Sequence, residues 1–248
     1  MAGLTESNLP ERLPSGKSTL SSGLPERPLN LANEEPRVAL DALLTQLLAR
    51  AENKTARPRL VGLAGPPGSG KTTLAAALAA ALPAAQALPM DGFHRDNRAL
   101  IAEGLLERKG APETFDAPAV LAAITALRAG RLQRWPGFDR AADCTLPDAI
   151  AIDANLEWVL IEGNYLLLEQ PVWRSLAGLF DETIWLDVPD PVLEARLIQR
   201  WRDHGLDEAA AQARARGNDL PNAALTKARS VRTGALVYHA PADAGTLL

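Results

Sequence analysis

The alternation of apolar and polar residues along the chain predicts strands separated by helices. Three uninterrupted apolar runs and two weaker ones have the length of strands: residues 59–65, 157–163 and 182–188, then 85–90 and 234–239. Strands that are apolar on both faces are typical of a parallel sheet covered on both sides. We therefore expect an α/β fold with a doubly wound parallel sheet and helices on both faces. Ligands of such sheets bind at the carboxyl ends of the strands.

Apolar residues at helical spacing predict the helices of this fold. Glycine closes two of them, and proline stands at the start of the last. The expected helices cover residues 38–51, 70–82, 117–130 and 191–205. Residues 1–36 instead contain five prolines and no sustained periodicity, which predicts a flexible tail. One folded domain is expected over residues 37–248.

Composition agrees with one domain and excludes some partners. The chain has 248 residues, 47% of them hydrophobic, which is enough for one sizeable core. Its formal net charge of -4 gives no general attraction to nucleic acid or to an anionic membrane. The single cysteine, Cys144, excludes an internal disulfide, and no apolar run approaches the roughly 20 residues that span a bilayer. Without a signal peptide at its start, the protein is expected to be cytoplasmic, and both a monomer and a homodimer are compatible with the sequence.

The segment "GPPGSGKTT" between the first strand and the second helix matches a complete phosphate-binding loop. Its glycines allow main-chain N–H groups to converge on phosphate oxygens, and the following helix N-terminus adds partial positive charge. Lys71 is expected to reach the β- and γ-phosphates of ATP, and the Thr72 hydroxyl to ligate Mg²⁺. The predicted nucleotide contacts are Gly65, Pro66, Pro67, Gly68, Ser69, Gly70, Lys71, Thr72 and Thr73.

A second Gly-Lys-Ser segment, around Lys17, lacks most of this context. Glu11 stands where the first glycine of the motif is required, no strand precedes the segment, and no helical pattern follows it. We interpret it as part of the tail.

Asp91 follows the second strand in "PMDGFHRDN", on the rim where the γ-phosphate is expected. Transfer of a phosphoryl group to an alcohol needs a carboxylate that orients the hydroxyl and takes its proton. We expect Asp91 to be this general base, one strand over from the phosphate loop, and to contact Mg²⁺ through water. The alternative is an aspartate that caps the turn at Gly92. His94 either orients the substrate or fills the loop.

Glu162 ends the apolar run "WVLIEG" at the same rim. A carboxylate at this strand end is suited to hold the water shell of Mg²⁺. A purely structural role would require a buried partner, because an unpaired buried carboxylate is costly, and the sequence names no such partner.

The strand-end Asp-x-Phe-His pattern after a phosphate loop resembles the group of uridine kinases, phosphoribulokinases and bacterial pantothenate kinases. "KGAPETFD" (109–116) is similar to a segment of the pantothenate kinases, and "VLIEGNYLLL" to the third strand of the whole group. The similarity extends from about Arg59 to His239. It is greatest to bacterial proteins described as fructose transport system kinases or uridine kinase-like. The resemblance implies the P-loop kinase fold with a lid.

In the resembled kinases a lid closes arginines over the phosphates, which excludes water and favours transfer over hydrolysis. Arg196 and Arg200 lie on one face of the predicted helix 191–205, and Arg214 and Arg216 follow. Arg200 is the expected catalytic arginine and Arg196 a substrate contact. The alternative is a solvated helix whose arginines pair with Glu194 and Asp203.

Several further residues are candidates for contacts with the acceptor. Residues 134–144 are expected to form an insertion on the substrate side. The predicted acceptor contacts are Lys109, Asp116, Phe138, Arg140 and, beside Glu162, Asn164 and Tyr165. The aromatic residues among them could equally anchor a small core. Residues 237–245 are the only candidates for contacts with the adenine base of ATP.

These patterns predict an ATP- and Mg²⁺-dependent kinase that phosphorylates a hydroxyl of a nucleoside, a sugar or a pantothenate-like alcohol. A nucleoside monophosphate kinase would require a clamp for an acceptor phosphate, and a base at Asp91 argues against it. A nucleotide-binding regulatory or transport-associated module that hydrolyses ATP slowly is the alternative from another class.

Overall fold

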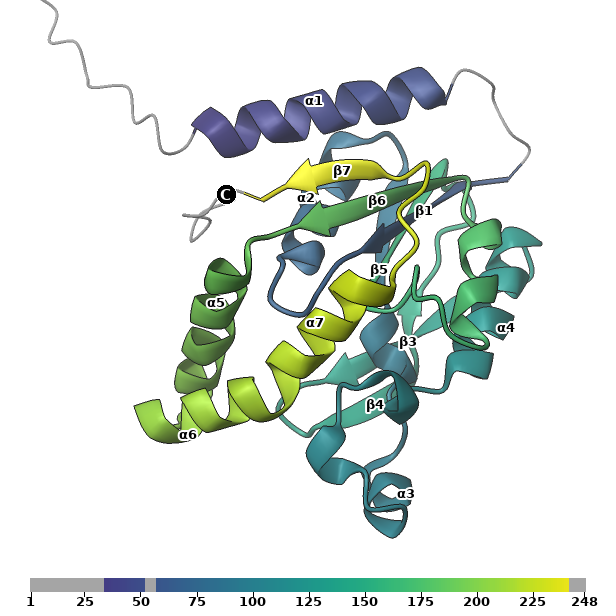
Figure 1. Ribbon diagram of the computed structural model, residues 1–248. Coiled ribbons are helices and arrows are strands. Elements are labelled where there is room, and N and C mark those ends of the chain that lie inside the picture. Colours follow the sequence, from purple (N-terminus) through teal and green to yellow (C-terminus); the bar gives the residue numbers. More distant parts are fainter. Residues whose placement is uncertain (1–33, 52–56, 241–248) are drawn as a thin grey trace, which may run out of the picture. The chain divides into compact units, whose positions relative to one another are not determined.

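The chain forms a five-stranded sheet in which every neighbouring pair of strands is parallel, in the order β2-β5-β1-β6-β7 (Figure 1). The computed structural model describes residues 34–51 and 57–240. All five predicted strands are present, as β1 (Arg59–Ala64), β2 (Ala85–Pro89), β5 (Trp158–Gly163), β6 (Glu182–Asp187) and β7 (Leu236–His239). The doubly wound α/β fold expected from the sequence is therefore confirmed.

Helices cover both faces of this sheet because alternate residues of each strand point to opposite sides. In β1, Leu60 and Ala64 join a core cluster that contains α4, whereas Val61 and Leu63 join a second cluster that contains α1, α2 and α5. The four predicted helices are α1 (Glu34–Arg50), α2 (Lys71–Ala81), α4 (Ala117–Arg128) and α5 (Asp190–Asp203). None of the helices described is long and apolar enough to cross a membrane.

The strand order places β5 between β1 and β2. The expectation that the second strand lies directly beside the first was therefore wrong: Asp91 stands two strands from the phosphate loop. Glu162, near the end of β5, occupies the position between them, opposite Leu63 of β1 and Pro89 of β2. Parallel strands that follow each other in the sequence need not be neighbours. The crossover helix between them can leave room for a third strand, which here is β5.

The expected insertion at residues 134–144 is part of an antiparallel hairpin formed by β3 (Arg134–Asp139) and β4 (Cys144–Ala151). It packs against the turn after β2, where Trp135 Nε1 donates to the Pro89 carbonyl at 2.8 Å. A Cβ atom at Gly92 would lie 2.2 Å from the carbonyl oxygen of Pro136. Gly92 is thus required by the close approach of the hairpin. Each hairpin strand contains a proline, which weakens the strand pattern in the sequence.

Between α5 and β7 the chain forms α6 (Glu208–Arg214), a π-helical turn (η7, Ala215–Asp219) and α7 (Leu220–Arg229), which follow one another without a break. These helices were not among those predicted from the sequence. The remaining elements are short: α3 (Asn97–Ala102) and the 3₁₀ turns η2 (Met90–Phe93), η3 (Leu106–Arg108), η4 (Pro112–Thr114), η5 (Trp173–Ser175) and η6 (Ala177–Leu179).

The expected tail, residues 1–36, lies outside the described residues except for its last three, which begin α1. The Gly-Lys-Ser segment around Lys17 also lies outside them. Of the candidate adenine stretch only 237–240 is described. There Tyr238 is buried, and its hydroxyl has no hydrogen-bond partner among the residues that the structure places.

Candidate active site

The phosphate loop lies between β1 and α2, at the carboxyl end of β1. Gly70 has a φ of 91°, a left-handed conformation that favours glycine, and helix α2 starts at the next residue. The loop is closed by a hydrogen bond from Ser69 N to the Pro66 carbonyl at 3.2 Å. These residues have the strand, turn and helix context that the motif requires.

Lys71 is buried, with 7% of its surface exposed, at the start of α2. Its ammonium donates to the Pro66 carbonyl at 2.9 Å and to Ser69 Oγ at 3.4 Å. Burial lowers the pKa of Lys71 to about 8, and the nearby carboxylates of Glu162 and Asp91 oppose this shift. The lysine therefore sits inside its own loop, held by weak neutral acceptors that a phosphate oxygen can replace.

Glu162 is paired with Thr72 of the phosphate loop, a residue that is itself exposed. Its carboxylate accepts a hydrogen bond from Thr72 Oγ1 at 2.8 Å, and only 6% of the residue is exposed. Burial raises the pKa of Glu162, while Lys71 acts in the opposite direction. The hydroxyl of the phosphate loop and the carboxylate of β5 thus converge on one point.

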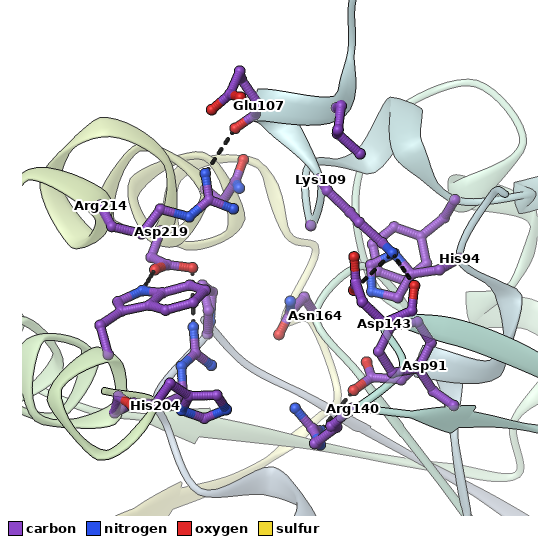
Figure 2. Close-up of a pocket in the computed structure, with 18 of the residues that line it drawn as sticks. Asp91, His94, Glu107, Lys109, Arg140, Asp143, Asn164, His204, Arg214 and Asp219 are labelled. Atoms are coloured by element: carbon purple, nitrogen blue, oxygen red, sulfur yellow. Dashed lines mark hydrogen bonds and ion pairs between the residues drawn. The ribbon is translucent and has the colours of Figure 1, made fainter. Parts of the chain in front are cut away.

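A cavity of about 570 Å³ opens beside the phosphate loop (Figure 2). Its wall brings together residues far apart in the sequence. Among the predicted site residues outside the loop, those that line it include Asp91, His94, Lys109, Phe138, Arg140, Arg200 and Arg214. Pro67 of the phosphate loop and Asn164 also contribute to the wall, so the cavity is continuous with the predicted nucleotide site.

Asp91 lies in the η2 turn after β2 and faces this cavity. Its carboxylate accepts a hydrogen bond at 2.8 Å from Nη2 of Arg140, the residue that follows hairpin strand β3 (Figure 2). Among the described residues, it makes no capping bond to the backbone of its own turn. The side chain of Arg140 is 62% exposed, and such an exposed ion pair contributes at most about 1 kcal/mol. A ligand can therefore replace Arg140 at little cost.

Lys109 is held in one position on the cavity wall. Its ammonium donates to Asn97 Oδ1 at 2.6 Å and to Asp143 Oδ1 at 2.8 Å, and it lies 5.0 Å from the centre of the Phe138 ring. Asn97 and Asp143 were not singled out from the sequence. Both are common loop residues, and only the fold brings them to Lys109.

His94 packs into the same wall. Its ring stacks on Phe115, with 3.9 Å between ring centres. Burial lowers the pKa of His94 to about 4, so the imidazole is neutral near pH 7. Its Nδ1 is buried and has no hydrogen-bond partner among the residues described. His94 thus lines the cavity as an imidazole that is neutral near pH 7.

Comparison with known proteins agrees with this site. No protein-family model matches the chain. It is 38% identical over 196 residues to "Uncharacterized protein YggC" of Escherichia coli, covering 77% of this chain and 81% of that protein. It is 35% identical to "Putative uridine kinase C227.14" of Schizosaccharomyces pombe, covering 66% of this chain and 75% of that protein. A solved structure called "putative fructose transport system kinase", from Silicibacter sp. TM1040, is 46% identical with a TM-score of 0.75 and covers 82% of this chain and 98% of that one.

The chain belongs to the P-loop kinases of the uridine kinase, phosphoribulokinase and pantothenate kinase group. Relatives in this family are ATP-dependent kinases. The resemblance expected from "GPPGSGKTT", the Asp-x-Phe-His pattern and the Glu-Gly strand end is confirmed.

Two predicted acceptor contacts have other positions in this family member. Asp116 is exposed and lies outside the cavity wall, where its carboxylate accepts from Ala119 N at 3.0 Å and caps α4. Tyr165 is completely buried, and its hydroxyl donates to the Gly110 carbonyl at 2.5 Å. Neither side chain lines the cavity in which the acceptor is expected. Asp116 stabilises a helix, and Tyr165 belongs to the aromatic core with Phe115 and Trp173.

The predicted lid arginines divide into three positions. Arg200 lines the cavity and pairs with Asp219 at 3.0 Å. Arg196 donates to the carbonyl of Gly68 in the phosphate loop at 3.5 Å, and burial lowers its pKa. Arg214 also lines the cavity, whereas Arg216 is exposed on the outside and pairs with Glu194 at 2.8 Å. The solvated alternative thus holds for Arg216.

The π-helical turn supplies site residues that the sequence analysis missed. Asp219 accepts from Arg200 Nη2 and from Trp201 Nε1, the latter at 2.5 Å. Asn218 donates to the Lys109 carbonyl at 2.8 Å and so ties the turn to the opposite wall. The segment "GNDLPN" follows Arg216 directly in the sequence, and none of its residues is among the predicted site residues. Its run of polar residues next to helical sequence is the signal that could have pointed to the cavity. In the structure Gly217, Asn218 and Asp219 lie in the π-helical turn, and such turns occur frequently at functional sites.

Proposed function

We propose that this protein transfers the γ-phosphoryl group of ATP to a hydroxyl of a small metabolite, with Mg²⁺ as cofactor. The observation that carries the proposal is the Asp91 carboxylate, which faces a cavity continuous with the phosphate loop. An ATPase has no need for an acceptor cavity with a carboxylate on its wall. A kinase needs both, to hold the alcohol and to take its proton.

The phosphate loop and Lys71 are proposed to bind the ATP phosphates. The start of α2 presents main-chain N–H groups and the positive end of the helix dipole. Lys71 would exchange its bonds with the loop for the β- and γ-phosphates, where its charge offsets the charge of the transferring group.

Thr72 and Glu162 fit a Mg²⁺ ion that is bound mainly by the nucleotide. Their oxygens lie 2.8 Å apart, and oxygen donors are the ligands that Mg²⁺ prefers. No cluster of three or more ligating side chains occurs in the described ranges, so water and phosphate oxygens would complete the coordination. When bound, the ion supplies positive charge to the phosphates and aligns them for transfer.

Asp91 is proposed to act as general base. The acceptor hydroxyl would displace Arg140 from the carboxylate and donate its hydrogen bond there. As the acceptor oxygen forms its bond to the γ-phosphorus, its proton passes to Asp91, and the bond from that phosphorus to the bridging oxygen breaks, so that ADP leaves. Arg200, which lines the same cavity, is proposed to stabilise the charge of the transferring group.

The test replaces Asp91 with asparagine, which keeps the shape of the side chain and removes the base. Asp91→Asn should slow acceptor phosphorylation by roughly 10²- to 10⁴-fold, the usual contribution of a positioned base, with ATP affinity nearly unchanged. Asp96→Asn is the matched control, because Asp96 caps α3 outside the cavity and asparagine caps equally well. Transfer is measured by mass spectrometry of the phosphorylated product, and ATP affinity by calorimetry.

Three outcomes would contradict the proposal. Phosphoryl transfer by Asp91→Asn at a near wild-type rate would show that Asp91 is not the general base. ATP hydrolysis that no alcohol accelerates would indicate the nucleotide-binding ATPase module instead. Phosphorylation of a nucleoside monophosphate on its phosphate group would indicate a nucleoside monophosphate kinase instead.

A further inference from the structure

The cations of the cavity wall differ in their partners. Four lysine or arginine side chains of the described chain line the cavity. Three of them are paired with a carboxylate: Lys109 with Asp143, Arg140 with Asp91 and Arg200 with Asp219. The fourth, Arg214, pairs with no carboxylate among the residues that the structure describes. It makes one hydrogen bond, from Nη1 to the main-chain carbonyl of Glu107 at 2.9 Å.

Arg214 is nevertheless held in a defined place. Its guanidinium carbon lies 5.1 Å from the centre of the Trp201 ring, within the range of a cation–π contact. Trp201 is fixed in turn by the bond from its Nε1 to Asp219 at 2.5 Å. A half-buried guanidinium stacked on a fixed indole loses little conformational entropy when it binds a ligand. Arg214 is therefore a preorganised cation, and its other N–H donors have no partner among the residues that the structure places.

The position of Arg214 separates it from the transfer site. Figure 2 shows Arg214 and Glu107 at one end of the cavity and the pair of Asp91 and Arg140 at the other, with Asn164 between them. A ligand that presents its hydroxyl to Asp91 would extend its remainder toward Arg214. A planar guanidinium with free donors is suited to bind a carboxylate or a phosphate through two parallel hydrogen bonds.

We propose that the acceptor is an anionic alcohol: it carries a carboxylate or phosphate group that binds Arg214, remote from the hydroxyl that receives the phosphoryl group. This inference rests on the proposed kinase function and narrows its substrate class. Neutral nucleosides and neutral sugars would leave Arg214 without a counter-charge in the occupied cavity, which is unfavourable for a partly buried cation.

The first experiment separates the acceptor class from the kinase function. A small-molecule extract of bacterial cells is divided by anion exchange into a retained, anionic fraction and a neutral flow-through. Nucleotides are removed from the retained fraction by enzymatic degradation before each fraction is incubated with the protein, Mg²⁺ and ATP labelled in its γ-phosphate. New labelled products should form in the anionic fraction, and mass spectrometry of the product then shows whether the acceptor carries a carboxylate or a phosphate. Products that form only in the neutral fraction overturn the inference and leave the kinase function intact. Product formation in neither fraction overturns both.

The second experiment uses the acceptor so identified and its neutral counterpart, the amide of a carboxylate or the dephosphorylated form of a phosphate. Arg214→Gln should raise KM for the anionic acceptor by about 10- to 100-fold, as expected for loss of a charge-assisted pair, with KM for ATP unchanged. The preference for the anionic acceptor over its neutral counterpart should also largely disappear. Arg216→Gln is the matched control, two residues along and outside the cavity, and should change neither value.

Unchanged preference in a folded Arg214→Gln protein would overturn the inference. A rise in KM for ATP instead of the acceptor would do the same, because it would place Arg214 on the nucleotide. If Arg214→Gln does not fold, Arg214→Lys keeps the charge without the bidentate fork. It should then retain the preference for an anion but with a raised KM, and an unchanged KM would count against the inference.

Discussion

At the scale of single residues, burial changes the protonation of Lys71. Its pKa of about 8 lies below the ordinary value of 10.5, so the unfolded chain binds more protons than the folded one between these two pH values. The contribution of this group therefore makes folding more favourable as pH rises through that window. Bound phosphates have the opposite effect on the lysine, because they favour its charged form.

ATP binding is accordingly expected to take up protons at pH 8 to 9. Part of Lys71 is neutral in the free protein at this pH and becomes charged when the phosphates bind. The affinity for ATP should fall as pH rises above about 8, by up to about tenfold per pH unit. Calorimetry in two buffers with different ionisation enthalpies measures the uptake. Lys71→Arg, which stays protonated in this range, should show none. Equal uptake by both proteins would contradict the prediction.

At the scale of elements, helix α4 depends on an N-terminal cap, Asp116, which was predicted from the sequence to contact the acceptor. Asp116 accepts from the Ala119 N–H at 3.0 Å, one of the helix donors that lack a partner within the helix. Asp116→Ala should lower the free energy of unfolding by about 1 kcal/mol, with Asp116→Asn close to wild type. Urea unfolding measures the change. KM for the acceptor should be unaffected, and a raised KM with wild-type stability would restore the substrate role.

The hairpin of β3 and β4 shows how an element without a clear local pattern can position a site. It is held by the bond from Trp135 to Pro89 and by the close fit at Gly92. Through this contact it brings Phe138 and Arg140 to the cavity. Trp135 and Pro89 are 46 residues apart in the sequence, so this contact has no local pattern that could predict it.

At the scale of the whole molecule, α5 carries Arg200 to the cavity, where it pairs with Asp219, which Figure 2 shows on the side opposite Asp91. If Arg200 stabilises the transferring phosphoryl group, Arg200→Ala should lower acceptor phosphorylation by more than tenfold, roughly the effect of losing one transition-state donor, with a much smaller change in ATP affinity. It should also raise the fraction of ATP that is hydrolysed, because the phosphoryl group is held less well against water.

Arg202→Ala is the control for this measurement. Arg202 lies on the same helix, half-exposed and outside the cavity, and its contact with Glu208 is 3.4 Å long. Product and free phosphate are measured in one reaction, so that the ratio of transfer to hydrolysis is obtained directly. A wild-type ratio for Arg200→Ala would show that this residue only pairs with Asp219.

The sequence by itself determined the features that depend on neighbouring residues. The phosphate loop, the helix that follows it and the five apolar strands are encoded locally, by glycine spacing and by runs of residues that are buried on both faces. The strand-end positions of Asp91 and Glu162 followed from the same runs. For the same reason the α/β class and the family could be recognised before the structure was known.

Only the tertiary structure decided which of these features meet. It placed β5 between β1 and β2, so that Glu162 stands between the phosphate loop and Asp91. It also buried Tyr165, removed Asp116 from the cavity, and joined Lys109 to Asp143 and Trp201 to Asp219. Such pairs are set by strand order and by packing between distant segments. Residue type and spacing do not record them, because the free energy that selects them comes from contacts that exist only once the chain has folded.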